Sequence, residues 1–208
     1  MEQERYHEVL LSGNTTKLEE LINAALQAGV PPQQLIREAL IPAMEKVGEK
    51  FKTNEIFLPE VMLAARVMQA GLAVLKPLLT GEPADYVGSV VIGTVQGDHH
   101  DIGKNLVAMM LEGAGFKVVD LGADVSAEKF LQAIRQHQPE ILGMSALLTT
   151  TMPKMKEVID LLVSARVRAQ VKVLIGGAPV TQEYADRIGA DGYAPDAGAA
   201  VEVAKKLL

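Results

Sequence analysis

The second half of the sequence alternates between short apolar runs and helical patterns, and this rhythm constrains the fold more than any other feature. The runs are β-branched and nearly continuous in apolar character, which is typical of parallel strands covered on both faces; they span residues 89–95, 116–122, 140–147 and 171–177. Helical patterns lie between and after them, at residues 104–115, 126–138, 152–167 and 183–189. The alternation predicts an open, doubly wound parallel sheet of the α/β class, in which ligands bind at loops after the carboxyl ends of strands.

The first part of the chain shows only helical periodicity, which predicts a small antiparallel helix bundle. Pro42 is expected to kink one of its helices, and Pro59 takes a favoured first-turn position in the last one. We therefore expect a helical domain at 1–80, a linker at 81–88 that is rich in Gly and Pro, and a Rossmann-like sheet domain at 89–208.

Composition excludes several classes of function. The chain has no cysteine, so thiolate metal ligands and thiol nucleophiles are absent and any chemistry must use residues such as His, Asp, Glu, Ser and Thr. A net charge of −6 and an aromatic content of 4% argue against nucleic acid as a partner. Neither a signal-peptide pattern nor an uninterrupted apolar stretch long enough to cross a bilayer is evident, so we expect a cytoplasmic protein that does not enter membranes.

The stretch GDHHDIGKN at residues 97–105 follows the first predicted strand and holds two of the four histidines in the chain. A phosphate-binding P-loop has four residues between its first glycine and its Gly-Lys pair, followed by Ser or Thr. Here five residues instead of four separate Gly97 from Gly103, and Asn105 stands where the motif has Ser or Thr. The carboxylates of the loop would also repel phosphate. The stretch is therefore not a P-loop.

Three interpretations of this loop remain. A polar loop with Asp at a turn and at a helix start needs no ligand at all. A hydrolytic metal site would use several of the Asp and His side chains, although catalytic zinc takes three protein ligands and no HExxH pair is present. In the third interpretation, one histidine binds a metal already held in a cofactor and a carboxylate orients its ring, a division of labour that suits Asp98 and His100.

The pattern D-x-H-x-x-G, formed by Asp98, His100 and Gly103, resembles the signature of the cobalamin-binding domain of methionine synthase, of corrinoid methyltransferase proteins and of B12-dependent mutases. Further motifs follow in the family's order, since residues 145–147 resemble its S-x-L and residues 176–177 its G-G. The helical segment EKFKTNEIFLPEVMLAARVM is similar to the cap domain of methionine synthase and of methylamine and methanol corrinoid proteins. The resemblance thus covers nearly the whole chain.

The resemblance implies that cobalamin binds base-off, with its dimethylbenzimidazole tail threaded into the sheet domain. His100 would be the axial cobalt ligand, Asp98 would accept a hydrogen bond from its other ring nitrogen, and Thr151 stands where methionine synthase has the serine of this relay. The other residues expected to contact the cofactor are those of the same loop and small residues along the tail channel: Gly97, Asp101, Ile102, Gly103, Ser145, Leu147, Thr149, Gly176 and Gly177.

In the helical domain, the resemblance assigns the covering of the cofactor's upper face to Phe51, Phe57, Leu58 and Val61. The alternative place for apolar residues at helical spacing is the core of the bundle. An apolar lid would keep water and oxygen from reduced cobalt. The remaining histidines, His7, His99 and His137, are expected at the surface without a ligand role.

The family resemblance also implies a function. The chain would shuttle a methyl group, cycling between cob(I)alamin and methylcobalamin, from a substrate-specific methyltransferase to an acceptor methyltransferase that uses tetrahydrofolate or a thiol such as coenzyme M. A reductive activase is a further expected partner in this anaerobic one-carbon metabolism, and methanol, methylamines, methoxylated aromatics and betaines all fit as donors. The alternative is a cobalamin-dependent sensor without its DNA-binding segment, and a mutase small subunit ranks third.

Overall fold

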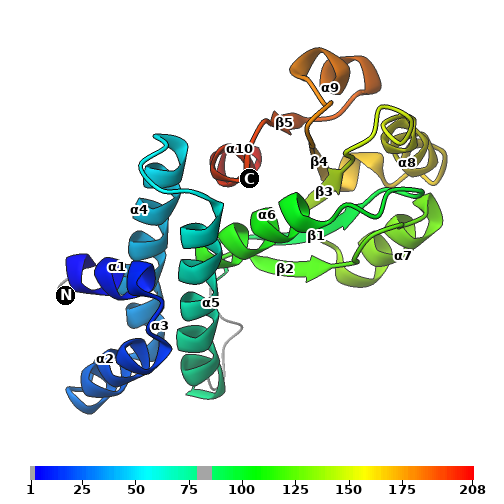
Figure 1. Cartoon of the computed structure of the whole chain (residues 1–208). Helices are drawn as coiled ribbons and strands as arrows, with labels where there is room; N and C mark the ends of the chain where they lie inside the picture. Colours follow the sequence, from blue (N-terminus) through cyan, green and yellow to red (C-terminus); the bar gives the residue numbers. More distant parts are fainter. Residues whose placement is uncertain (1–2, 79–85) are drawn as a thin grey trace. The chain divides into compact units, whose positions relative to one another are not determined.

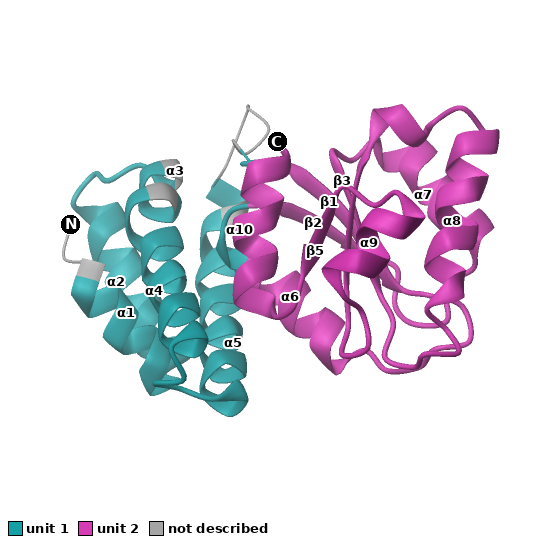
Figure 2. Cartoon of the chain, turned by 90° about the horizontal axis from the view of Figure 1, so that it is seen from above, with its two compact units in different colours: residues 1–87, 112–115 teal, residues 88–111, 116–208 magenta. Residues whose placement is uncertain are grey.

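The computed structural model describes residues 3–78 and 86–208, and the chain divides into two compact units (Figure 2). One unit comprises residues 1–87 and 112–115, and the other comprises residues 88–111 and 116–208. Residues 81–85 of the expected linker lie outside the described part of the chain.

The first unit is helical (Figure 1). Its helices are α1 Gln3–Ser12, α2 Thr15–Gln27, α3 Pro32–Leu35, α4 Ile41–Lys52 and α5 Leu58–Leu75, with a π-helical turn η1 Ile36–Leu40 and a 3₁₀ turn η2 Lys76–Leu78. Near Pro42, where a kink is expected, the structure has the π-helical turn η1, in which the N–H of Ile41 bonds to the carbonyl oxygen of Ile36, five residues back. Because proline has no N–H to donate, the regular α-helical ladder cannot run unbroken through this point.

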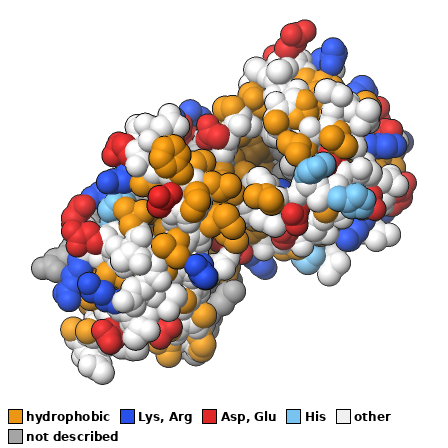
Figure 3. Space-filling view, in the orientation of Figure 1, with side chains coloured by type: hydrophobic (Ala, Val, Ile, Leu, Met, Phe, Trp, Pro, Cys, Tyr) orange, Lys and Arg blue, Asp and Glu red, His pale blue; other side chains and the backbone are white. Residues whose placement is uncertain are grey.

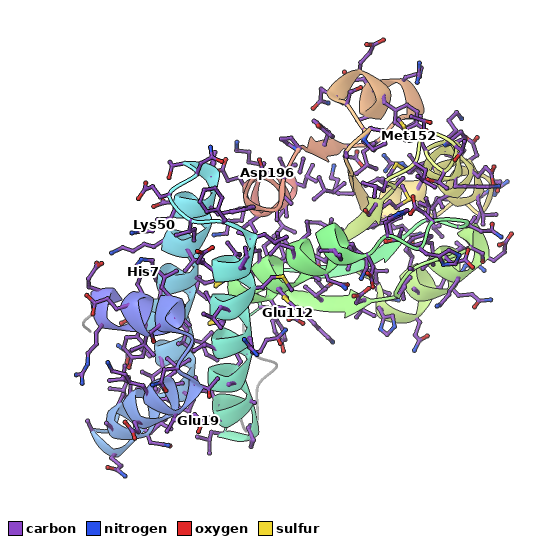
Figure 4. All side chains as sticks on the ribbon, viewed as in Figure 1. His7, Glu19, Lys50, Glu112, Met152 and Asp196 are labelled. Carbon is purple, nitrogen blue, oxygen red and sulfur yellow. The ribbon has the colours of Figure 1, made fainter. Side chains whose placement is uncertain are left out.

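Helices α1, α2, α4 and α5 surround an apolar core that includes the fully buried Leu10, Leu18 and Val47. His7 of α1, labelled in Figure 4, is buried as well, and its Nδ1 lies 3.2 Å from the carbonyl oxygen of Ala43 in α4. The expectation that His7 lies at the surface is therefore wrong. Its ring packs between α1 and α4, and the contact with the Ala43 carbonyl oxygen offsets part of the cost of burying a polar ring.

Helix α5 is the one described helix with the length and apolar composition of a membrane-spanning segment. Its fully buried residues include Val61, Ala64 and Val67, and the helix packs against α1, α2 and α4. Part of its apolar character thus belongs to the bundle core.

The second unit contains a sheet of five parallel strands in the order β2-β1-β3-β4-β5. The strands are β1 Ser89–Thr94, β2 Lys117–Asp120, β3 Ile141–Ser145, β4 Lys172–Gly176 and β5 Gly192–Ala194. The helices are α6 Ile102–Gly113, α7 Ala127–His137, α8 Pro153–Ser164, α9 Gln182–Ile188 and α10 Ala197–Leu207, with the 3₁₀ turn η3 Arg168–Gln170. Helices α6 and α10 lie on one face of the sheet and α7 and α8 on the other (Figure 2), so the expected doubly wound architecture is confirmed.

The strand register brings the functional loops to one edge. Thr94, the last residue of β1, is paired with Ser145, the last of β3, and Ser145 is paired with Gly176, the last of β4. The chain order reverses between β1 and β3, since β2 lies on the far side of β1. In open α/β sheets this switch point is where ligands bind, and here the loops after β1 and β3 meet at it.

Candidate functional site

Asp98 lies in the loop after β1 and is the centre of a hydrogen-bond cluster. Its Oδ2 accepts from the Leu147 N–H at 2.7 Å, the Leu148 N–H at 3.3 Å and the Thr151 hydroxyl at 2.7 Å. Its Oδ1 accepts from the N–H of His100 at 3.1 Å and lies 2.8 Å from His100 Nδ1. The carboxyl therefore ties the loop after β1 to the loop after β3.

The side chain of Asp98 is fully buried, and its surroundings decide its charge. Burial alone would raise the pKa of Asp98, but the hydrogen bonds from Thr151, Leu147 and His100 outweigh burial and hold this pKa well below its usual range. Asp98 is thus an anion at neutral pH.

His100 is positioned by this anion. An ionised carboxylate can only accept hydrogen bonds, so the proton of a neutral ring must lie on Nδ1, leaving Nε2 with a free lone pair on the opposite edge. The side chain of His100 is 53% exposed, whereas its partner Asp98 is completely covered. Figure 3 shows histidines at the surface of the sheet-containing unit next to hydrophobic side chains. The arrangement leaves one ring nitrogen, Nε2, with the lone pair that a metal ion could accept.

Thr151 completes the predicted trio. Its hydroxyl lies within hydrogen-bond distance of Asp98 Oδ2 and also of the Leu148 carbonyl oxygen, at 2.9 Å. The residue is buried at the turn that leads into α8. Asp98, His100 and Thr151, expected as a relay from the sequence, are therefore in direct contact through hydrogen bonds.

The remaining predicted residues of this unit lie on the same edge. Ile102 and Gly103 begin α6, Asp101 directly precedes them, and Leu147 and Thr149 are exposed in the loop after β3. Ile102, Leu147 and Leu148 are large apolar side chains that stay exposed in the segments that carry or follow the His100 loop and the loop after β3. This edge of the sheet therefore offers exposed apolar side chains as well as polar ones.

Gly176 and Gly177 follow the end of β4, and the structure supplies an internal reason for each. A Cβ at Gly177 would lie 1.9 Å from the carbonyl oxygen of Ala146, and its φ is +128°. A Cβ at Gly176 would come within 3.0 Å of the Ala194 carbonyl oxygen. The backbone clash and the positive φ explain Gly177 within the protein, whereas the contact at Gly176 is tight but could be relieved by a shift of a few tenths of an ångström. The tail channel that the family resemblance implies at these two residues stays a prediction.

The residues expected to cover the cofactor belong to the helical unit. Phe57 is 64% exposed, whereas Phe51 and Leu58 are partly buried. Val61 is fully buried among the helices and belongs to the bundle core. Phe57 is the member of this set with a large free apolar face.

These side chains fit a metal ion that a cofactor already holds, so that the protein would supply only one ligand. No group of three or more His, Asp and Glu side chains that could hold a metal ion occurs among the described residues, so the hydrolytic site considered above is not formed there. Gly103 has an ordinary helical backbone, and nothing lies within 4 Å of the Cβ it lacks. The described surroundings of Gly103 therefore do not require glycine there, and the first turn of α6 is open at this position.

Several residues that shape the site were not found from the sequence. Asp124, in the loop after β2, accepts a hydrogen bond from the Gly97 N–H at 2.7 Å, and its own N–H donates to the Asp98 carbonyl oxygen at 3.0 Å. Lys104 is buried although it directly follows Gly103. Both roles depend on partners that come together only in the folded chain, and no motif in the sequence marks either residue.

Comparison with known proteins identifies relatives along the whole chain. A family model described as B12 binding domain matches residues 88–202, and a second model with the same description matches residues 2–76. The trimethylamine corrinoid protein of Methanosarcina barkeri is 46% identical over 91% of this chain and 88% of its own length. Dimethylamine corrinoid protein 3 of Methanosarcina acetivorans is 43% identical over 97% of this chain and 96% of its own length.

Solved structures give the same result. The methanol:cobalamin methyltransferase complex of Methanosarcina barkeri contains a chain with a TM-score of 0.89 and 34% identity, matched over 100% of this chain and 80% of that one. A cobalamin-binding protein from Desulfitobacterium hafniense matches with a TM-score of 0.80 and 32% identity over 98% and 97% of the two chains.

Proposed function

Because the chain belongs to the family of corrinoid proteins with a B12-binding domain, we propose that it carries a methyl group between two methyltransferases on a corrinoid cofactor. The observation that carries this proposal is the Asp98–His100 pair, which offers one oriented imidazole nitrogen at the switch point of the sheet. When bound, the corrinoid supplies the cobalt centre that accepts and releases the methyl group.

In this proposal His100 would hold the cobalt of the corrinoid through Nε2, with the cofactor base-off. Asp98 keeps the ring proton on Nδ1, which orients the ring so that the Nε2 lone pair is free for a metal. Thr151 and the amides of residues 147 and 148 hold the Asp98 carboxylate in place.

The residues around His100 have a separate role. Ile102, Leu147 and Leu148 would contact the apolar part of the cofactor, and Gly103 leaves room for its plane. In the helical unit, Phe57 is the side chain best suited to exclude water from the other face.

The partners proposed are a donor methyltransferase, an acceptor methyltransferase that uses tetrahydrofolate or coenzyme M, and a reductive activase, all in the cytoplasm. A methylamine-specific donor enzyme is favoured, since the relatives that are 43% and 46% identical are named for dimethylamine and trimethylamine. The relative from the methanol system is 34% identical.

The proposal is tested with protein loaded with cobalamin and reduced without oxygen. With a matching donor methyltransferase and its methylamine, we expect the spectrum of methylated cobalamin to form at least about tenfold faster than with the same concentration of free cobalamin, because the protein holds the reacting centre in place. The acceptor enzyme with its acceptor should then remove the methyl group. Cobalamin that binds firmly but is never methylated by donor enzymes for methylamines, methanol, methoxylated aromatics or betaines would refute the carrier role and favour the sensor.

A further inference from the structure

Lys104 is a buried cation for which the proposed function has no use. It lies in the first turn of α6, and its side chain is 1% exposed. Its ammonium group forms an ion pair with Asp120, the last residue of β2, and donates a hydrogen bond to the side-chain oxygen of Asn105. Burial of a lysine ammonium group costs free energy, which only a close ionic partner can offset, so the burial of Lys104 calls for an explanation.

Hydrogen bonds connect this ion pair to His100. The second oxygen of Asp120 accepts from the Gly122 N–H at 2.9 Å, and the Gly122 carbonyl oxygen accepts from the Thr94 N–H at 2.9 Å. The hydroxyl of Thr94, which is fully buried, donates to the carbonyl oxygen of His100 at 3.2 Å. The path runs from α6 through the end of β2 to the backbone of His100.

The loop after β2 also holds the His100 loop at a second point. Asp124 bonds to the Gly97 N–H and to the Asp98 carbonyl oxygen, as described above. The Val125 N–H donates to the Thr94 carbonyl oxygen at 2.9 Å. The loop at 120–125 therefore supports the His100 loop along its length, and Lys104 fixes the start of that support.

We propose that Lys104 is a positioning residue that, through Asp120 and the loop after β2, holds the backbone of His100 at the height where Nε2 can reach the metal. The inference rests on the proposed ligation of cobalt by His100. Asp98, held by Thr151 and by two amides of the loop after β3, orients the imidazole, whereas Lys104 fixes the backbone from the β2 side. Both constraints are needed because the side chain of His100 is half exposed, so packing around the ring is incomplete.

The test is Lys104→Met, because an apolar side chain of similar length can replace a buried charge while Asp120 remains partly solvated. The matched control is Lys117→Met, an exposed lysine at the opposite end of β2. The proteins are loaded with cobalamin, reduced to the cobalt(II) form, and titrated with ¹⁵N-labelled imidazole. Electron paramagnetic resonance then distinguishes the two ligands, because the ¹⁴N of His100 splits each line into three and the ¹⁵N of imidazole that replaces it splits each line into two.

We expect Lys104→Met to bind one corrinoid per chain, but to lose His100 coordination at about tenfold lower imidazole concentration than wild type, a typical effect of removing support behind a metal ligand. The control should match wild type. A folded Lys104→Met protein with the wild-type titration would overturn the inference. If Lys104→Met does not fold, Asp120→Asn decides, since it removes the charge of the partner and keeps the lysine packed. If wild type binds no corrinoid, or binds it without axial nitrogen splitting, the proposed function itself is wrong.

Discussion

Replacing Asp98 with asparagine is expected to lower the free energy of unfolding by about 3 kcal/mol at neutral pH. The buried carboxylate accepts hydrogen bonds on both oxygens, whereas in asparagine one of these oxygens becomes an NH2 group, a donor that would face the N–H or O–H donors already there. Urea unfolding of the full chain, followed by circular dichroism, measures the loss.

The effect of Asp98→Asn should depend on pH in a defined direction. The pKa of Asp98 is depressed in the folded protein, so its contribution is fully present above the unfolded-state value, about 3.9, and disappears as the pH falls toward the folded-state value. The difference between wild type and variant should be constant above about pH 5 and shrink below about pH 4. Asp160→Asn, on the exposed face of α8, serves as the control and should change little. A difference that stays the same down to pH 3 would contradict the ionised state assigned to Asp98.

Alanine at Gly177 is expected to destabilise the protein by at least about 3 kcal/mol, because it combines backbone strain with a steric clash. The new Cβ would lie 1.9 Å from the Ala146 carbonyl oxygen, and the clashing atom is backbone, which cannot rotate away. Relief requires movement of the end of β3, directly before the amides of Leu147 and Leu148 that bind Asp98. The substitution should therefore weaken corrinoid binding as well as stability.

Gly189→Ala is the matched control for Gly177→Ala. Gly189 also has a positive φ, +78°, but nothing lies within 4 Å of its missing Cβ. Only the backbone strain remains there, which costs about 1–2 kcal/mol. Equal losses in thermal unfolding of the two variants would show that the contact between the ends of β3 and β4 is not tight.

The architecture could be predicted because its signals are local. Runs such as 89–95 are apolar throughout, as strands buried on both faces must be, and the helices between them carry 3.6-residue periodicity. The site could be predicted in part for a similar reason. Asp98 and His100 are two residues apart in one loop, and Thr151 came from the family resemblance.

Burial of polar residues could not be predicted in this way. A lysine in the first turn of a helix is normally exposed, and Lys104 is buried because the end of β2, sixteen residues later, supplies Asp120. His7 is buried because α1 packs on α4, thirty-six residues away in sequence at the contact with Ala43. In both cases a partner distant in the chain decides the environment, and the local pattern contains no sign of it.

The sequence also could not show why glycine stands at a given position. The family resemblance assigns Gly176 and Gly177 to the tail channel, and this stays a prediction. The structure adds a reason within the protein for Gly177, because a Cβ there would clash with the Ala146 carbonyl oxygen. Gly103 has no such neighbour and no positive φ, so its described surroundings do not require glycine.

Cobalt ligation by His100 is tested most directly by comparing wild type, His100→Ala and His99→Ala after addition of hydroxocobalamin. His99 is the exposed neighbour of His100 and tests whether any histidine in this loop suffices. We predict that all three proteins bind the cofactor, and that after reduction to cobalt(II) wild type and His99→Ala show the paramagnetic splitting from one axial nitrogen, which His100→Ala lacks. A wild-type protein that binds no corrinoid, or an unchanged signal in His100→Ala, would contradict ligation by His100.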